Sequence, residues 1–217
     1  MSEIVNVIAL DNPNLVFPME RASFYKEQTE IYEKTGKPTK AVELVNVFLF
    51  NEAGQMIIQK RASSKAHNPD LMDKAVGGHI VHGDTPHFTV MLETIQELQV
   101  PSIVASNDED FRKIHKLLKD YMATTAVVKY IGSEITSLKK IINGKEISIG
   151  NKTHLYIGIY EGSVKNVDRE AKGILFYSLE ELEDELNRFP QIFTYDLQYY
   201  YHKYKDYFRN FISEIKK

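Results

Sequence analysis

The chain has 217 residues, of which 43% are hydrophobic, and its 27 basic and 30 acidic side chains give a net charge of −3. This length suits one large domain, and the hydrophobic content excludes general disorder. The nearly balanced charge argues against a nucleic-acid partner, and the lack of cysteine excludes disulfides, a thiolate nucleophile and cysteine-ligated zinc.

The N-terminal stretch MSEIVNVIAL has no basic start, and its apolar run is too short and broken for a signal peptide. The sequence contains no run of about 18 apolar residues, so no membrane span is expected. We therefore expect a cytoplasmic protein that does not associate with membranes.

The first hundred residues alternate between strand and helix signals. Strands are predicted at 4–10, 44–51 and 56–61, a partly helical segment at 21–38, a loop at 62–75, a short strand pair with glycine turns at 76–84, and a helix at 86–99. The strands at 44–51 and 56–61 form a hairpin around the turn NEAGQ.

The second half continues this mixed pattern. It predicts a helix at 107–122 capped by Asn107 or Asp108, strands at 125–132 and 154–162 around a polar hairpin-like stretch, a helix at 178–190 capped by Ser178, and a last helix from about Tyr195 to the end. Helices placed between strands predict an α+β fold, arranged as an α/β/α sandwich.

The predicted helix at 86–99 carries an apolar stripe and an acidic face. Asp84 or Thr85 can cap this helix, and Pro86 suits its first turn. The stripe consists of Phe88, Met91, Leu92, Ile95 and Leu98, whereas Glu93, Gln96 and Glu97 share another face. Two carboxylates one turn apart beside a glycine turn can hold a hard divalent cation, although the same spacing is also typical of a solvated helix face.

The stretch from Gly78 to Val100 resembles the Nudix box, G-x5-E-x7-R-E-U-x-E-E-x-G-U, in which U is apolar. The register holds without a gap, with matches at Gly78, Glu93, Glu97 and Val100 and a near match at Asp84. The sequence departs from the pattern at Leu92 in place of Arg, Thr94 in place of an apolar residue, Gln96 in place of Glu and Gln99 in place of Gly.

Most of residues 40–100 and 150–200 is similar to the branch of this superfamily that includes type I isopentenyl-diphosphate isomerase. The resemblance implies a Nudix fold with a mixed central β-sheet over residues 1–217, as a single domain. Residues 1–40 would be an N-terminal extension, 101–150 an inserted segment and 195–217 a C-terminal helix.

The resemblance also implies a metal site. Glu93 and Glu97 would be catalytic and would bind Mg²⁺ or Mn²⁺, with Gln96 and Asp84 as further metal-site residues. Because Gln96 brings no charge, a third carboxylate from outside the box would help the site. The candidates for that carboxylate are Glu43, Glu161 and Glu170.

For the substrate, the resemblance implies that Arg61 and Lys65 contact a diphosphate, with Gly78 and His79 beside it; a solvated basic loop explains Arg61 and Lys65 equally well. His79, His82 and His87 lack an evident further partner for zinc, so we expect His79 to serve the substrate loop. The cysteine that the isomerases use in catalysis would fall at Gly77, which argues against isomerase activity.

The implied function is that of a MutT-like, metal-dependent pyrophosphatase acting on a diphosphate linkage in a small phosphorylated metabolite. The alternative is a catalytically impaired Nudix domain that binds a phosphorylated ligand in a regulatory or structural role. The aromatic stripe of the last helix, which includes Tyr200, Tyr201 and Phe208, suits core packing or a homodimer contact rather than a nucleic-acid surface.

Overall fold

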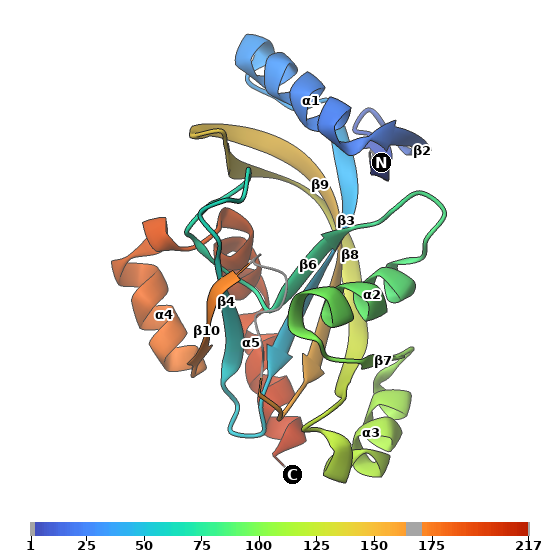
Figure 1. Cartoon of the computed structure of the whole chain (residues 1–217), viewed down its shortest axis with the longest axis vertical. Helices are drawn as coiled ribbons and strands as arrows, with labels where there is room; N and C mark the ends of the chain where they lie inside the picture. Colours follow the sequence, from blue (N-terminus) through green and yellow to red (C-terminus); the bar gives the residue numbers. More distant parts are fainter. Residues whose placement is uncertain (1–2, 164–170, 217) are drawn as a thin grey trace.

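The computed structural model describes residues 3–163 and 171–216. In this part of the chain a mixed β-sheet lies between helix α2 (Pro86–Leu98) and helix α5 (Tyr195–Ile215) (Figure 1). The other helices are α1 (Arg21–Thr35), α3 (Asp108–Leu117) and α4 (Leu179–Arg188), with 3₁₀ turns η1 (Lys119–Tyr121) and η2 (Pro190–Ile192). Across the described ranges, every helix is too short or too polar to cross a membrane.

The sheet has two long strands at its centre, β3 (Lys40–Phe50) and β9 (Lys145–Ile159). Its other strands are β1 (Ile4–Ala9), β2 (Asn12–Glu20), β4 (Met56–Arg61), β5 (Met72–Asp73), β6 (Val76–His79), β7 (Ser102–Ala105), β8 (Ala126–Ile142) and β10 (Ala171–Tyr177). The order is β10-β4-β3-β9-β8-β7, and β1 and β6 also pair with β3. The β3–β9 and β7–β8 pairs are parallel, and the other pairs are antiparallel.

Strand β3 separates two cores because successive side chains point to opposite faces of a sheet. Val45, Val47 and Leu49 pack with the buried side of α2. Phe48 and Phe50 pack on the other face against α5, where Phe208 lies 5.1 and 5.7 Å from their ring centres. The aromatic stripe of the last helix therefore packs in the core, which was one of its two predicted roles, beside a homodimer contact.

Several local predictions are confirmed, including the strand at 56–61 and the helix caps. Thr85 Oγ1 accepts from the amide of Phe88, and Asn107 accepts from the amide of Asp110. Ser178 forms a reciprocal capping box with Glu181. The described structure therefore begins α2, α3 and α4 where the sequence predicts.

The predicted strand pair at 76–84 is wrong. Strand β6 pairs with β3, with Gly78 opposite Val45, and the chain then makes only an isolated bridge between Val81 and Val5. Gly77 and Gly78 thus lie within a strand, where β3 supplies the partner that a local hairpin would have supplied.

The orientation expected for the helix at 86–99 is also wrong. Three members of its apolar stripe, Phe88, Met91 and Ile95, are 51%, 43% and 50% exposed. The buried side carries Thr89, Val90, Thr94 and Leu98. A polar residue is tolerated there because the hydroxyls of Thr94 and Ser102 lie 2.9 Å apart and satisfy each other.

The segments predicted as an N-terminal extension and as an insertion both contribute strands to the sheet. Residues 3–35 form the β1–β2 hairpin and α1, and β1 pairs with β3. Residues 101–150 supply β7, α3, β8 and the start of β9. The long β8–β9 hairpin turns at Asn143 and Gly144, both with positive φ, and extends toward α1 (Figure 1).

Candidate active site

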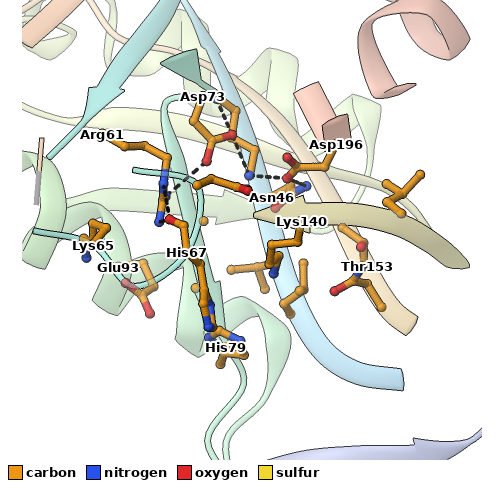
Figure 2. A pocket seen from close by; sticks show the side chains of 18 of the residues that line it. Asn46, Arg61, Lys65, His67, Asp73, His79, Glu93, Lys140, Thr153 and Asp196 are labelled. Atoms are coloured by element: carbon orange, nitrogen blue, oxygen red, sulfur yellow. Dashed lines mark hydrogen bonds and ion pairs between the residues drawn. The ribbon is translucent and has the colours of Figure 1, made fainter. Parts of the chain in front are cut away.

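A cavity of about 150 Å³ lies between α2, the loop before β5, the start of α1 and the β8–β9 hairpin, and residues of β3, β6 and α5 also line it. Six of the residues predicted for the site line it, namely Arg61, Lys65, Gly78, His79, Glu93 and Glu97. Figure 2 shows Lys65 and Glu93 on one side of this cavity and Thr153 and Asp196 on the other. The motif residues are therefore brought together around one enclosed space.

The two box glutamates lie one turn apart on α2 and face this cavity. Gly78 makes room for the first of them: a Cβ at residue 78 would overlap the Glu93 carboxylate and lie 2.6 Å from its Cγ. Glu97 accepts a hydrogen bond of 3.0 Å from Gln59 Nε2. Strand β6 can thus approach α2 closely only because residue 78 has no side chain.

Gln96 and Asp84 are placed differently. Gln96 is exposed on α2 and Asp84 precedes the helix, and neither side chain lines the cavity. Thr85 provides the helix cap for which Asp84 was the other candidate. The structure therefore leaves these two residues outside the group formed by Glu93 and Glu97.

The acids considered as a third carboxylate also lie elsewhere. Glu43 is buried between His154 (2.8 Å), Lys152 (3.0 Å) and Asn6 (2.9 Å). Burial alone would raise the pKa of Glu43, but these hydrogen bonds outweigh it and lower the pKa to about 2. Glu161 is exposed and accepts from the amide of Glu52, and Glu170 lies outside the described residues.

The donor set fits one particular kind of metal site. Among the described residues, no group of three or more His, Cys, Asp or Glu side chains is arranged to hold an ion. Mg²⁺ needs only one or two protein carboxylates when substrate phosphates and water complete its coordination. Glu93 and Glu97 fit such an ion and would not form an all-protein cage.

Two further aspartates line the cavity, but both hold a buried lysine. Lys74 Nζ lies 2.9 Å from Asp73 Oδ1 and 2.5 Å from Asp196 Oδ2, and the lysine side chain is 6% exposed. Burial would lower the pKa of Lys74, but the two carboxylates raise it, so the ammonium stays charged. Thr194 also donates to Asp73, at 2.9 Å.

This lysine occupies the neighbourhood of Gly77. A Cβ at residue 77 would lie 2.8 Å from Lys74 Cε and 3.3 Å from Asn46 Oδ1. The space in which a longer side chain at residue 77 would extend is thus filled by Lys74 and Asn46. The chain also has no cysteine, so no thiol is present to act as the catalytic group that the resemblance places at residue 77.

One wall of the cavity is cationic. The Arg61 guanidinium donates to the carbonyl of His67 from Nε and Nη2 (3.2 and 3.1 Å) and to Asp73 from Nη1 (3.2 Å). Burial, followed by the charges of Lys140, Arg21, Arg61 and Lys65, lowers the pKa of His67 to about 3. The cationic side chains of Arg21, Arg61, Lys65 and Lys140, which all line the cavity, favour an anion there.

A second and more open cavity of about 800 Å³ adjoins the first. The two share Arg21, Arg61, Lys65 and His67, together with Glu3, which pairs with Arg21 at 2.6 Å. The second is bounded by α1 and by the turn between β8 and β9. An anion held at the shared cationic wall therefore has room beside it for an attached organic group.

Sequence reasoning missed the contributions of Arg21, Lys74, Lys140 and Asp196. Lys74 and Asp196 are 122 positions apart, and Lys140 comes from the β8–β9 arm. No spacing connects these residues in the sequence. The adjacent lysines Lys139 and Lys140 near the end of β8 carry no pattern that indicates a ligand.

Comparison with known proteins places this geometry in context. No protein-family model matches the chain. An isopentenyl-diphosphate Δ-isomerase of Streptomyces coelicolor is 36% identical over 148 residues, which cover 68% of this chain and 62% of that protein. A Nudix hydrolase of Deinococcus radiodurans is 33% identical over 86 residues, or 37% of this chain and 50% of that protein. The chain thus matches between half and two thirds of the length of these relatives.

The fold is similar to that of the Deinococcus radiodurans protein DR0079, whose crystal structure superposes with a TM-score of 0.61. The match covers 93% of this chain and 98% of that one, at 18% sequence identity. The similarity extends beyond the box and its flanks to the whole arrangement of sheet and helices.

Proposed function

Because the chain belongs to the Nudix superfamily, we propose that it is a metal-dependent hydrolase that cleaves a diphosphate linkage in a small phosphorylated metabolite. One observation carries this proposal: Glu93 and Glu97 line the same cavity as Arg61 and Lys65. Carboxylates for a divalent cation thus lie beside cations for a diphosphate.

The residues of the cavity divide the work between binding and chemistry. Arg61, which the His67 carbonyl and Asp73 hold in place, binds phosphate oxygens together with Lys65. Glu93 and Glu97 would hold Mg²⁺ or Mn²⁺, which when bound would neutralise phosphate charge and acidify water. As a water oxygen attacks phosphorus, Glu93 takes the water proton, and the bridging P–O bond breaks with its electron pair on the leaving phosphate.

Isomerisation is a poorer fit to this chain, although a relative is named for it. Gly77 stands where the resemblance places the catalytic cysteine of the isomerases, and the chain has no cysteine at all. Lys74 and Asn46 fill the adjoining space. We therefore assign diphosphate cleavage to the cavity.

The alternative is a domain that binds a phosphorylated ligand without cleaving it. It is favoured by Leu92 and Gln96, which remove an arginine and a carboxylate from the box pattern. It is also favoured by the engagement of Asp73 and Asp196 with Lys74, which leaves two box acids for the metal.

The test is phosphate or pyrophosphate release from nucleoside, sugar, coenzyme and prenyl diphosphates with Mg²⁺ or Mn²⁺. We expect metal-dependent turnover that falls on the order of 10²-fold or more in Glu93→Gln and Glu97→Gln. Glu180→Gln, which changes an exposed carboxylate on α4, should leave turnover unchanged. Ligand-induced thermal stabilisation without turnover on any compound would establish the binding domain instead.

A further inference from the structure

Helix α1, from the N-terminal segment, contacts the site through a tyrosine. Tyr25 Oη lies 2.8 Å from His79 Nε2, and Lys140 Nζ lies 3.2 Å from the same oxygen. Tyr25 is 6% exposed, and its ring packs edge-on against Phe24 at 5.2 Å and at a tilt against His67 at 4.2 Å. The hydroxyl is therefore fixed between an ammonium and an imidazole.

The protons in this chain of contacts have one arrangement that satisfies every group. An ammonium has no acceptor, so Lys140 donates to the tyrosine oxygen. The single hydroxyl proton of Tyr25 then needs an acceptor, and within the described residues that acceptor is His79 Nε2. Nε2 must therefore be unprotonated, and the ring proton of neutral His79 is on Nδ1.

The charges around His79 keep the ring neutral. Burial, followed by the nearby charges of Arg21 and Lys140, holds the pKa of His79 well below its usual range. A neutral imidazole carries one proton, so the bond at Nε2 determines what the ring presents at Nδ1.

The other ring nitrogen, Nδ1, is left for a ligand. His79 lines the cavity, and Nδ1 has no hydrogen bond to another residue of 3–163 and 171–216. It is also not among the buried polar atoms without a partner, so solvent reaches it. We infer that an occupant of the cavity beside Arg61 and Lys65 reaches Nδ1 as well. A phosphate oxygen can accept from an N–H at this point but is repelled by a nitrogen lone pair.

We propose that Tyr25 is a positioning residue that holds His79 in the Nδ1–H tautomer, so that His79 donates a hydrogen bond to a phosphate oxygen of the ligand. The phosphorylated ligand is taken from the proposed function, whereas the tautomer follows from the contacts of the free protein. Tyr25 thereby takes part in ligand recognition without touching the ligand.

The first test is the tautomer itself, measured by NMR on protein with ¹⁵N-labelled histidine, without metal or ligand. In the wild type, the His79 signals should show protonated Nδ1 and unprotonated Nε2. In Tyr25→Phe, which keeps the ring and its packing, the Nε2–H form should appear. Tyr121→Phe is the matched control, because Tyr121 is 62% exposed and lies on η1, away from the cavity.

The second test is the affinity for inorganic pyrophosphate, measured by calorimetry. One neutral hydrogen bond corresponds to about a three- to tenfold loss in Tyr25→Phe, with unfolding temperature as the check on folding. His79→Asn keeps an amide N–H near the Nδ1 position and should bind nearly as the wild type does, whereas His79→Gln should not. In the His79→Asn background, Tyr25→Phe should have no further effect on affinity.

Protonated Nε2 in the wild type would overturn the proposal, as would a Tyr25→Phe variant with unchanged tautomer and affinity. A wild-type chain that does not bind pyrophosphate would overturn the ligand half of it. Both measurements are made without turnover. A chain that binds pyrophosphate as described but hydrolyses no diphosphate would therefore refute the hydrolase and leave this proposal standing.

Discussion

Replacement of Lys74 by Met removes a charge from the base of the cavity while keeping nearly the same side-chain length. In the wild type the ammonium lies 2.9 Å from Asp73 and 2.5 Å from Asp196 and is almost inaccessible to solvent. In the variant these two carboxylates remain near each other without the cation between them. Asp73 retains Arg61 and Thr194, but Asp196 loses its ion pair.

The expected loss of stability is large, because removal of one partner from a buried ion pair costs about 3–5 kcal/mol. For a chain of this size each kcal/mol corresponds to about 2–4 °C, so the unfolding temperature should fall by roughly 6–20 °C. Urea denaturation at pH 7 measures the same difference directly. Lys113→Met is the control: its pair with Glu109 is exposed on α3, and such pairs contribute about 0.3–0.5 kcal/mol.

The pH dependence supplies an independent check. Burial alone would raise the pKa of Asp196, but Lys74 holds it well below its usual range. The stability from this carboxylate is present above the ordinary aspartate pKa and is lost as pH falls toward the lowered one. The difference between wild type and Lys74→Met should therefore shrink below about pH 4. A loss under about 1 kcal/mol at pH 7 would refute the reasoning that the pair is buried and unscreened.

Three further predictions follow from single residues. Gly78→Ala should weaken Mn²⁺ binding, followed by electron paramagnetic resonance, by about tenfold or more, because the new Cβ displaces Glu93; unchanged affinity would exclude Glu93 as a ligand. Gln99 ends α2 with a left-handed backbone, φ 55°, which glycine adopts more easily than glutamine. Gln99→Gly should therefore stabilise the fold by about 0.5–1 kcal/mol in urea denaturation. A loss of stability would show that the Gln99 side chain contributes packing. Burial and four cations lower the pKa of His67 to about 3, so between pH 6.5 and 3 the unfolded chain binds a proton that the folded chain does not, and stability falls as pH falls. His67→Asn should make this fall shallower in urea denaturation. Equal slopes of stability against pH in the variant and the wild type would show that His67 is exposed to water.

The sequence predicts best those features that are decided within a few residues. The caps at Thr85, Asn107 and Ser178 and the turn after Phe50 depend on local hydrogen bonds, and each lies where the pattern places it. The spacing from Gly78 to Glu93 carries the box register in the same way. Convergence of these two residues in one cavity follows from β6 and α2 being neighbours in the chain.

Strand β2 and the orientation of α2 could not be predicted, for a common reason. Most of β2 is exposed, so it lacks the alternation that marks a half-buried strand. The apolar stripe of α2 faces outward, and a threonine hydrogen-bonded to Ser102 takes the core side. In both elements a partner outside the element decides burial, and hydrophobicity within the element does not report that partner.

The same distinction applies to the residues of the candidate site. The box glutamates and the Arg61–Lys65 loop follow from a motif and can be carried over by position. The contacts that define the remaining walls, Lys74 with Asp196 and Tyr25 with His79, join residues 122 and 54 positions apart. Neither pair follows a recognisable sequence spacing. Lys74 nevertheless fills the space beside Gly77, and Tyr25 determines which ring nitrogen of His79 carries the proton. Differences in chemistry among proteins with similar boxes are therefore to be sought in such long-range polar pairs, where a single substitution changes a charge or a donor without disturbing the motif.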